Sequence, residues 1–332
     1  MATDRSRDPI PSRPRSELLD ALSTEEHDQT SAATRHWQVA KHLWRALKSL
    51  GYTRGHMLAI GVDADLLAGR PPARRRRDTD RVPERLRRLQ FHAPIPAGNR
   101  WQHRGLTLHQ PDSDDDPHQY DVVIANLPYN DVIFADPGRR AVLAAHHGDL
   151  ITGALRETTP GGVVVALAAH AFMDDRDPRP REQVGELADL AGAIRLPQGS
   201  LRPSALCFGP IDLLLLRRRP PGSDPAPTSF QTSSLVSLDE SDFYLNEYWQ
   251  AHSERMVGDL GPSLEPTVAT LYALEGDLDR DLPGPVDQMV AAAHRTGLTA
   301  PRLDTSGPAS NTPANAPAPS RSSRTAPGHE AL

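Results

Sequence analysis

The stretch 126–129, Asn-Leu-Pro-Tyr, follows the apolar run 122–125, and its residue types could perform chemistry on a planar amino group. The exocyclic nitrogen of adenine is a demanding example of such a group, because its lone pair is drawn into the ring. A site that alkylates this nitrogen must accept hydrogen bonds from both of its N–H groups. The side-chain oxygen of Asn126 and the main-chain carbonyl of Leu127 are suitable acceptors.

The next two residues of this stretch would hold and complete the acceptors. Pro128 restricts Leu127 to an extended conformation, which fixes the direction of the Leu127 carbonyl. Tyr129 offers a ring face on which a base turned out of a duplex could stack. The four residues therefore predict one site for a planar amino or amide group, and the alternative is an ordinary turn after a strand.

The hydrophobic pattern indicates the elements that must position this stretch. Val39, Leu43 and Leu47 recur at helical spacing, and Gly51 can end that helix. Continuous apolar strands that alternate with helices are typical of a parallel sheet covered on both faces. The last two strands have no helix between them, so they are expected to pair as an antiparallel end. The expected strands are 56–62, 121–126, 163–170, 193–197 and 211–219, and the expected helices include 31–50 and 179–192.

The stretch 126–129 resembles the Asn-Pro-Pro-aromatic motif of amino-methyltransferases that use S-adenosylmethionine, with Leu127 in place of the first proline. Further segments resemble adenine-N6 DNA methylases of the kind found in large methylase–helicase proteins of plasmids and phages. The resemblance covers roughly residues 31–265 and includes no phosphate-binding Gly-Lys-Thr/Ser loop. The segments that resemble those enzymes are 159–172, 186–201, 211–219 and 245–260.

The resemblance implies a fold, a cofactor and a reaction. The implied fold is α/β and Rossmann-like, with a mostly parallel sheet, an antiparallel terminal hairpin and helices on both faces. The implied reaction is methyl transfer from S-adenosylmethionine to adenine N6, with Asn126, Leu127, Pro128 and Tyr129 as the catalytic motif. Ligands of such sheets lie at the carboxyl ends of the strands, and the motif occupies one of these ends.

The cofactor loop of that family departs from its usual form in this sequence. Gly61 stands where the first loop glycine belongs, but Asp63 and Asp65 fall where the next two glycines would be. A Cβ and a carboxylate at these positions would obstruct close approach of the main chain and repel the cofactor's own carboxylate. The segment 30–34 also lacks the aromatic residue and the Thr-Pro pair that help to cover the cofactor in the family.

The segment 61–65 has a second interpretation, as the acidic end of the second strand of the fold. Asp63 or Asp65 would then hold the ribose hydroxyls of the cofactor. This interpretation leaves too little chain upstream for a first strand and its glycine-rich loop, so we favour the first one. The carboxylates at 78–80 are a further candidate for the ribose contact.

A dense arginine block at 70–88 suggests contacts with nucleic acid. Its members Arg74, Arg75, Arg76 and Arg77 could bind DNA phosphates, and the alternative is a solvated loop. The formal net charge of -6 argues against a general polyanion binder. The arginine block and the resemblance nevertheless make DNA the expected partner, and a protein that supplies target recognition is a candidate second partner.

Several other functions find little support in the sequence. The single cysteine, Cys207, excludes an internal disulfide framework and a multi-cysteine zinc site. The adjacent His146 and His147 would point in different directions, so no metal site is expected. His170 follows an expected strand and either lines the same crevice as Asn126 or fills the core. No apolar run approaches 18 residues, which predicts a cytoplasmic protein without a membrane span.

The composition divides the chain into four parts. Residues 1–30 and 301–332 are polar and predicted to be disordered tails, 31–220 is the methyltransferase-like domain, and 221–300 is a mainly helical extension. Three functions follow: an active adenine-N6 DNA methyltransferase, an inactive relative that binds nucleic acid or protein, or a methyltransferase for an amide or amino nitrogen in protein or RNA. The intact stretch 126–129 favours the first function, and the loop 61–65 favours the second.

Overall fold

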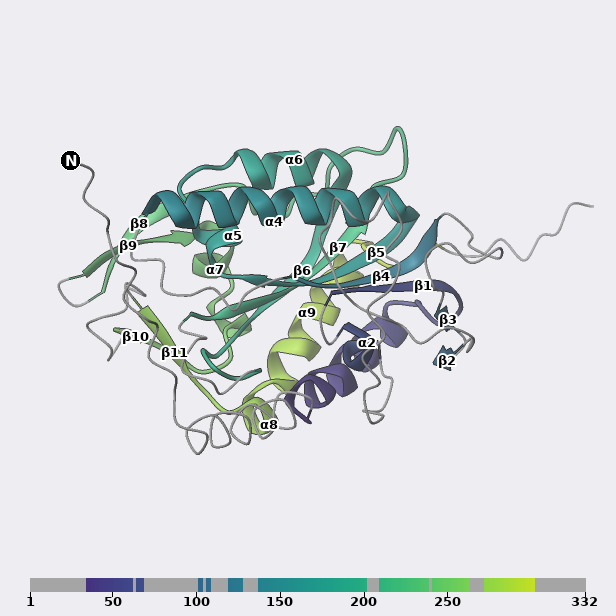
Figure 1. Cartoon of the computed structure of the whole chain (residues 1–332), viewed down its shortest axis with the longest axis horizontal. Helices are drawn as coiled ribbons and strands as arrows, with labels where there is room; N and C mark the ends of the chain where they lie inside the picture. The colour runs from purple at the N-terminus through teal and green to yellow at the C-terminus, as the bar shows by residue number, and fades with distance from the viewer. Residues whose placement is uncertain are drawn as a thin grey trace, which may run out of the picture. The chain divides into compact units, whose positions relative to one another are not determined.

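A seven-stranded sheet is the centre of the protein in this computed structural model (Figure 1). Its strands lie in the order β2-β3-β1-β4-β5-β7-β6. The strands are β1 (Gly55–Ile60), β2 (Trp101–His103), β3 (Leu106–Leu108), β4 (Tyr120–Asn126), β5 (Thr158–Ala169), β6 (Ala188–Leu196) and β7 (Ile211–Arg218). The structure describes residues 34–61, 64–68, 101–103, 106–108, 119–127, 137–201, 209–238, 241–262 and 272–301.

The strand directions give the sheet a mixed character near both ends. Strands β3, β1, β4 and β5 are parallel neighbours, whereas β7 is antiparallel to both β5 and β6. Strand β2 is antiparallel to β3. The predicted antiparallel terminal pair is therefore confirmed, with the reversed strand β7 inserted between β5 and β6. This is the Rossmann-like α/β fold of methyltransferases that the sequence predicted.

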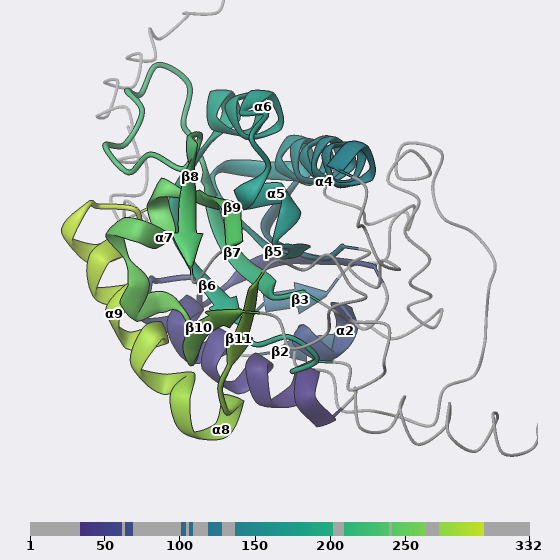
Figure 2. The same ribbon diagram turned by 90° about the vertical axis from the view of Figure 1, so that its left-hand side faces the viewer.

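Helices cover both faces of the sheet, as Figures 1 and 2 show. Along β4, Val123 packs toward one face and Val122 toward the other, because successive side chains of a strand alternate. One face is covered by α4 (Pro137–Glu157), α5 (Ala171–Asp174), α6 (Arg179–Leu187) and α7 (Glu247–Ala251). The other face is covered by the helix 34–49, α2 (Ala64–Leu67) and α9 (Pro283–Arg295).

The helix predicted at 179–192 is shorter than the pattern suggested. Helix α6 ends at Leu187, and β6 begins at Ala188 and pairs with β7 along its whole length. Long-range pairing with β7 thus overrides the local helical pattern of these residues. Gly192 in β6 allows α9 to approach closely, because a Cβ there would lie 2.3 Å from Cγ of Met289.

The described part of 221–300 contains strands as well as helices, which differs from the predicted mainly helical extension. The short alternating segments pair with each other, as period-2 patterns do. In the pair formed by 233–238 and 241–246, the side chains of Phe243 and Leu245 are buried. The two-stranded sheets are β8 (Ser233–Leu238) with β9 (Ser241–Asn246), and β10 (Asp259–Pro262) with β11 (Tyr272–Glu275).

The helix 34–49 is fastened along its length to α8 (Leu278–Asp281), to α9 and to the residues that follow α9. Gln38 donates to Asp279 at 2.9 Å, and Arg45 pairs with Asp287 at 2.7 Å. Further along, Ser49 Oγ lies 3.3 Å from Nε2 of His294. The N–H of Ala300 finally donates to the carbonyl of Leu50 at 2.8 Å. The first helix and the last helix of the described chain therefore form one layer.

A buried ionic cluster joins the sheet to the later part of the chain. Arg195 on β6 donates to both carboxylate oxygens of Asp212 on β7 and, at 2.8 Å, to Asp174 on α5. All three side chains have no solvent exposure. Asp174 also accepts the N–H of Asn246, and the Arg195 guanidinium lies 4.5 Å from the ring centre of Trp249.

Candidate functional site

The carboxyl ends of β1 and β4 lie side by side at the centre of the sheet. Ile60 and Ala125 are partners in the ladder, so Gly61 and Asn126 follow at neighbouring positions. The chain leaves β1 through α2 on one face and leaves β4 through α4 on the other face. Such a divergence is a topological switch point, where ligands of open α/β sheets bind.

Asn126 is buried at this point and contacts His36. Its side chain is 4% exposed, and its Nδ2 lies 3.4 Å from Nε2 of His36. An amide nitrogen donates and does not accept, so in this contact Nε2 of His36 is the acceptor. Because the contact uses the nitrogen side of the amide, the Oδ1 of Asn126 is directed away from His36.

His36 is the site residue that the sequence analysis missed. It lies in the first turn of the helix 34–49 and is fully buried. Its position, four residues before Ala40 and seven before Leu43, lies on the apolar stripe of that helix. A polar residue on this stripe was the available signal, because a buried imidazole requires a hydrogen-bond partner.

Substitutions at His36 should separate an acceptor role from a packing role. His36→Leu removes the acceptor for Asn126 and should lower the kcat of a reaction at this site about tenfold, the value of one hydrogen bond. His36→Gln retains an oxygen acceptor and should keep most of the activity. Steady-state kinetics of the two variants test this, and equal kcat values would contradict the positioning role.

Leu127 continues the register of β4 into the motif. Its N–H donates to the carbonyl of Leu167 on β5 at 3.0 Å, and its side chain is buried. The main chain that carries the second candidate acceptor is therefore fixed to the sheet on its amino side. Pro128 and Tyr129 lie outside the described residues.

Gly61 forms the turn from β1 into α2. Its φ of 101° is a left-handed conformation that glycine adopts without strain, and its carbonyl accepts the N–H of Ala64 at 3.3 Å. Strand β1 pairs directly with β4, as the first strand of such folds does, which favours the first-strand interpretation of 56–62. Asp63 lies outside the described residues, and Asp65 belongs to α2.

His170 follows β5 at the same edge of the sheet. Its N–H donates to the carbonyl of Pro210 at 3.3 Å, and its ring packs on the main chain of Gly209, where a Cβ would lie 2.5 Å from Cε1. Burial lowers the pKa of His170 to about 3, and the positive charge of Arg140 adds to this decrease. The imidazole is therefore neutral at pH 7.

The depressed pKa of His170 predicts a pH dependence of stability. An unfolded chain has a histidine pKa of about 6.5, so between about pH 6.5 and pH 3 the unfolded chain binds a proton that the folded chain does not. This difference lowers the free energy of unfolding as pH falls below about 6.5. Urea unfolding at about pH 7.5 and pH 5.5 should show a smaller decrease for His170→Gln than for the wild type. An equal decrease in both proteins would contradict the assignment.

The remaining sequence candidates are placed only in part. The arginines Arg74, Arg75, Arg76 and Arg77 and the single Cys207 lie outside the described residues. His147 is buried in α4. Within the described ranges, no three His, Cys, Asp or Glu side chains gather in a way that could hold a metal ion. None of the described helices is long and apolar enough to cross a membrane.

Comparisons with known proteins give distant structural similarity. No family model matches the chain, and no curated protein matches it. A putative class I S-adenosylmethionine-dependent methyltransferase from Listeria monocytogenes has 17% identity and a TM-score of 0.35, and the match covers 58% of this chain and 63% of that one. A second similar structure is Haemonchus contortus phospholethanolamine N-methyltransferase 2 in complex with phosphomonomethylethanolamine and S-adenosylhomocysteine. It has 12% identity and a TM-score of 0.26, and the match covers 56% of this chain and 39% of that one.

The chain thus spans less than two thirds of the length of either structure. The fold class rests on the strand order, the inverted strand β7 and the two covered faces. Together these features define a Rossmann-like α/β fold with helices on both faces of the sheet. Its candidate site is the switch point between β1 and β4.

Proposed function

We propose that the protein transfers a methyl group from S-adenosylmethionine to the N6 amino nitrogen of adenine in DNA. The observation that carries the proposal is the buried Asn126 at the carboxyl end of β4, with the nitrogen of its amide held by His36. The resemblance of 126–129 to the motif of amino-methyltransferases supports it. A cytoplasmic location and a protein partner that supplies target recognition belong to the same proposal.

The protein's own residues would orient the amino group of the substrate. The Oδ1 of Asn126 accepts one N–H of adenine, and the carbonyl of Leu127 accepts the other. When both N–H groups donate to these acceptors, the nitrogen lone pair is less delocalised into the ring. It is then free to face the methyl group of the donor. Both hydrogen bonds strengthen as positive charge develops on the nitrogen, so they stabilise the transition state more than the ground state.

The residues at the end of β1 fit the cofactor in one respect. The left-handed Gly61 beside Asn126 allows the main chain to approach a ligand closely, and the short β1–α2 turn would hold S-adenosylmethionine, which supplies an electrophilic methyl group when bound. In the sequence, Asp63 and Asp65 stand where the second and third glycines of the cofactor loop would be, and two carboxylates there would repel the carboxylate of the cofactor. We therefore expect weak binding.

Calorimetric titration with S-adenosylmethionine tests the proposal most directly. Saturable heat is expected at sub-millimolar to millimolar cofactor, and Asp63→Gly should bind more tightly because it removes one repulsive carboxylate. Absence of binding at millimolar concentration would contradict the enzymatic function. It would leave the inactive nucleic-acid-binding or protein-binding module, for which DNA retention at low salt would be compared between the wild type and a variant with Arg74–Arg77 replaced by Ser.

The chemical class of the substrate is tested separately. A planar N–H₂ group also occurs in RNA bases and in the amide side chains of proteins, and Asn126 could accept hydrogen bonds from any of them. Transfer of a labelled methyl group to DNA, RNA and protein preparations should be seen with DNA. Transfer to RNA or protein alone would favour the third function over the proposed one.

A further inference from the structure

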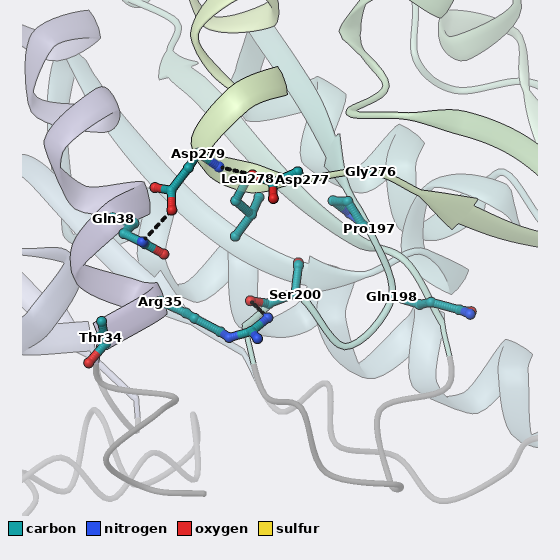
Figure 3. A pocket seen from close by; sticks show the side chains of 10 residues that line it. All are labelled: Thr34, Arg35, Gln38, Pro197, Gln198, Ser200, Gly276, Asp277, Leu278 and Asp279. Carbon is teal, nitrogen blue, oxygen red and sulfur yellow. Dashed lines mark hydrogen bonds between the residues drawn. The ribbon is translucent and has the colours of Figure 1, made fainter.

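Arg35 and Gln38, which lie on either side of His36 in the helix 34–49, line a pocket of about 580 Å³. It lies between the start of the helix 34–49, the turn that follows β6, and the start of α8 (Figure 3). Strands β5 and β6 are both antiparallel to β7, and β4 is parallel to β5, so β4, β5 and β6 run in the same direction. The end of β6 therefore lies at the same edge of the sheet as Asn126 at the end of β4. The same turn of helix that brings His36 to Asn126 brings Arg35 and Gln38 to the pocket.

We infer that this pocket binds a base of the substrate strand next to the adenine that is methylated. The inference rests on the proposed function and adds to it a second contact with the substrate. The pocket volume lies within the range that small-molecule sites of proteins occupy, about 300–1,000 Å³, and a single nucleobase requires less.

Arg35 provides a flat surface for a base. Its Nη1 donates to the carbonyls of Gly199 and Ser200 at 3.4 and 3.1 Å, and these two bonds hold the guanidinium in one orientation. Guanidinium planes stack on nucleobases and on aromatic rings. The side chain of Leu278, which is 8% exposed, and Pro197 add apolar surface to the lining.

Two polar groups could form hydrogen bonds with the edge of the base. Nε2 of Gln38 donates to Asp279 at 2.9 Å, so the Oε1 of Gln38 is directed away from Asp279 and can accept from an exocyclic amino group (Figure 3). The Oγ of Ser200 is buried and has no hydrogen-bond partner among the described residues. A buried hydroxyl that can both donate and accept favours a ligand with polar edges.

The charge of the lining favours a base over a phosphate group. The pocket has two carboxylates, from Asp277 and Asp279, and one guanidinium, from Arg35. A phosphate in this space would meet a net negative lining, which is unfavourable at short distance. A neutral base with amino and carbonyl groups meets no such repulsion, while its own phosphates remain outside in solvent.

The test measures methyl transfer by the full-length protein to single-stranded oligonucleotides with one target adenine. The three oligonucleotides have an abasic position on the 5′ side of this adenine, on its 3′ side, or nowhere. Wild type should lose about tenfold in kcat/KM for one of the two abasic oligonucleotides, because one stacked base is lost. Arg35→Ala and Gln38→Ala should lose activity on the intact oligonucleotide and respond little further to the abasic position.

Arg45→Ala is the matched control. It removes the same charge from the same helix, about 15 Å further along, where Arg45 pairs with Asp287 outside the pocket. This variant should respond to the abasic position as the wild type does. Calorimetric binding of S-adenosylmethionine and thermal unfolding should be similar in all variants, which shows that each variant is folded.

Three results would overturn the inference, and they distinguish the base pocket from the proposed function. Wild-type transfer with equal kcat/KM for the three oligonucleotides, or variants of Arg35 and Gln38 that behave like Arg45→Ala, would reject the base pocket alone. Absence of transfer by the wild type to all three oligonucleotides would reject the proposed function, and the inference with it.

Discussion

Asn126→Ala is expected to lower methyl transfer to adenine-containing DNA by about a hundredfold to a thousandfold. The variant loses the oxygen that accepts an N–H of the substrate and that binds more strongly in the transition state. The affinity for S-adenosylmethionine should change little, because in the proposed function the Asn126 amide contacts His36 and binds the substrate, not the cofactor. Single-turnover transfer of a labelled methyl group, together with calorimetric titration of the cofactor, measures both quantities.

Two further variants control for the loss of a buried side chain. Asn126→Asp keeps an oxygen acceptor and should retain measurable transfer. Asn246→Ala removes a fully buried asparagine whose amide donates to the carbonyls of Met173 and Phe230, far along the chain from the motif. This variant should lose stability but retain the kcat of the wild type at a temperature at which it is folded. Unaltered transfer in Asn126→Ala would reject the site.

Arg195→Met is expected to lower the free energy of unfolding by about 3–5 kcal/mol. The substitution leaves the carboxylates of Asp174 and Asp212 buried without the cation that both contact. It also removes the cation that lies over the ring of Trp249. Urea unfolding at pH 7 measures the loss, and a change below about 1 kcal/mol would show that the cluster contributes little to stability.

The pH dependence of the Arg195→Met variant gives an independent check. In the wild type, burial raises the pKa of Asp212 to about 6, while Arg195 opposes this increase. A folded pKa above the unfolded one means that the folded chain gains stability as pH falls below about 6. Without Arg195 the carboxylates should protonate more readily, so the deficit of Arg195→Met should shrink between about pH 8 and pH 5. The double variant Arg195→Met, Asp212→Asn should recover part of the loss at pH 7.

The sequence predicted most of the sheet because buried parallel strands are continuous apolar runs. The strands predicted at 56–62, 121–126 and 163–170 could be recognised in this way and correspond to β1, β4 and β5, although β1 ends at Ile60 and β5 begins at Thr158. The beginning of β6 could not, because the segment 188–192 continues the composition of a helix and becomes a strand only through its pairing with β7. Local pattern contains no information on such a long-range partner.

The candidate site was predictable in part for the same reason. Asn126 and Leu127 are adjacent in sequence, so a short motif reveals them. His36 lies 90 residues before Asn126 and reaches it only after the sheet and the first helix have packed. The pocket depends on three segments distant in sequence, near residues 35, 198 and 278, and no short pattern could have placed them together.

The layer formed by the helix 34–49 with α8 and α9 has a consequence for the order of folding during synthesis. The helix that carries His36 leaves the ribosome early, but its contacts with Asp279 and Asp287 require residues made more than 200 positions later. Domains generally fold as units. A nascent chain that ends before residue 277 therefore has the motif but cannot complete the layer behind His36.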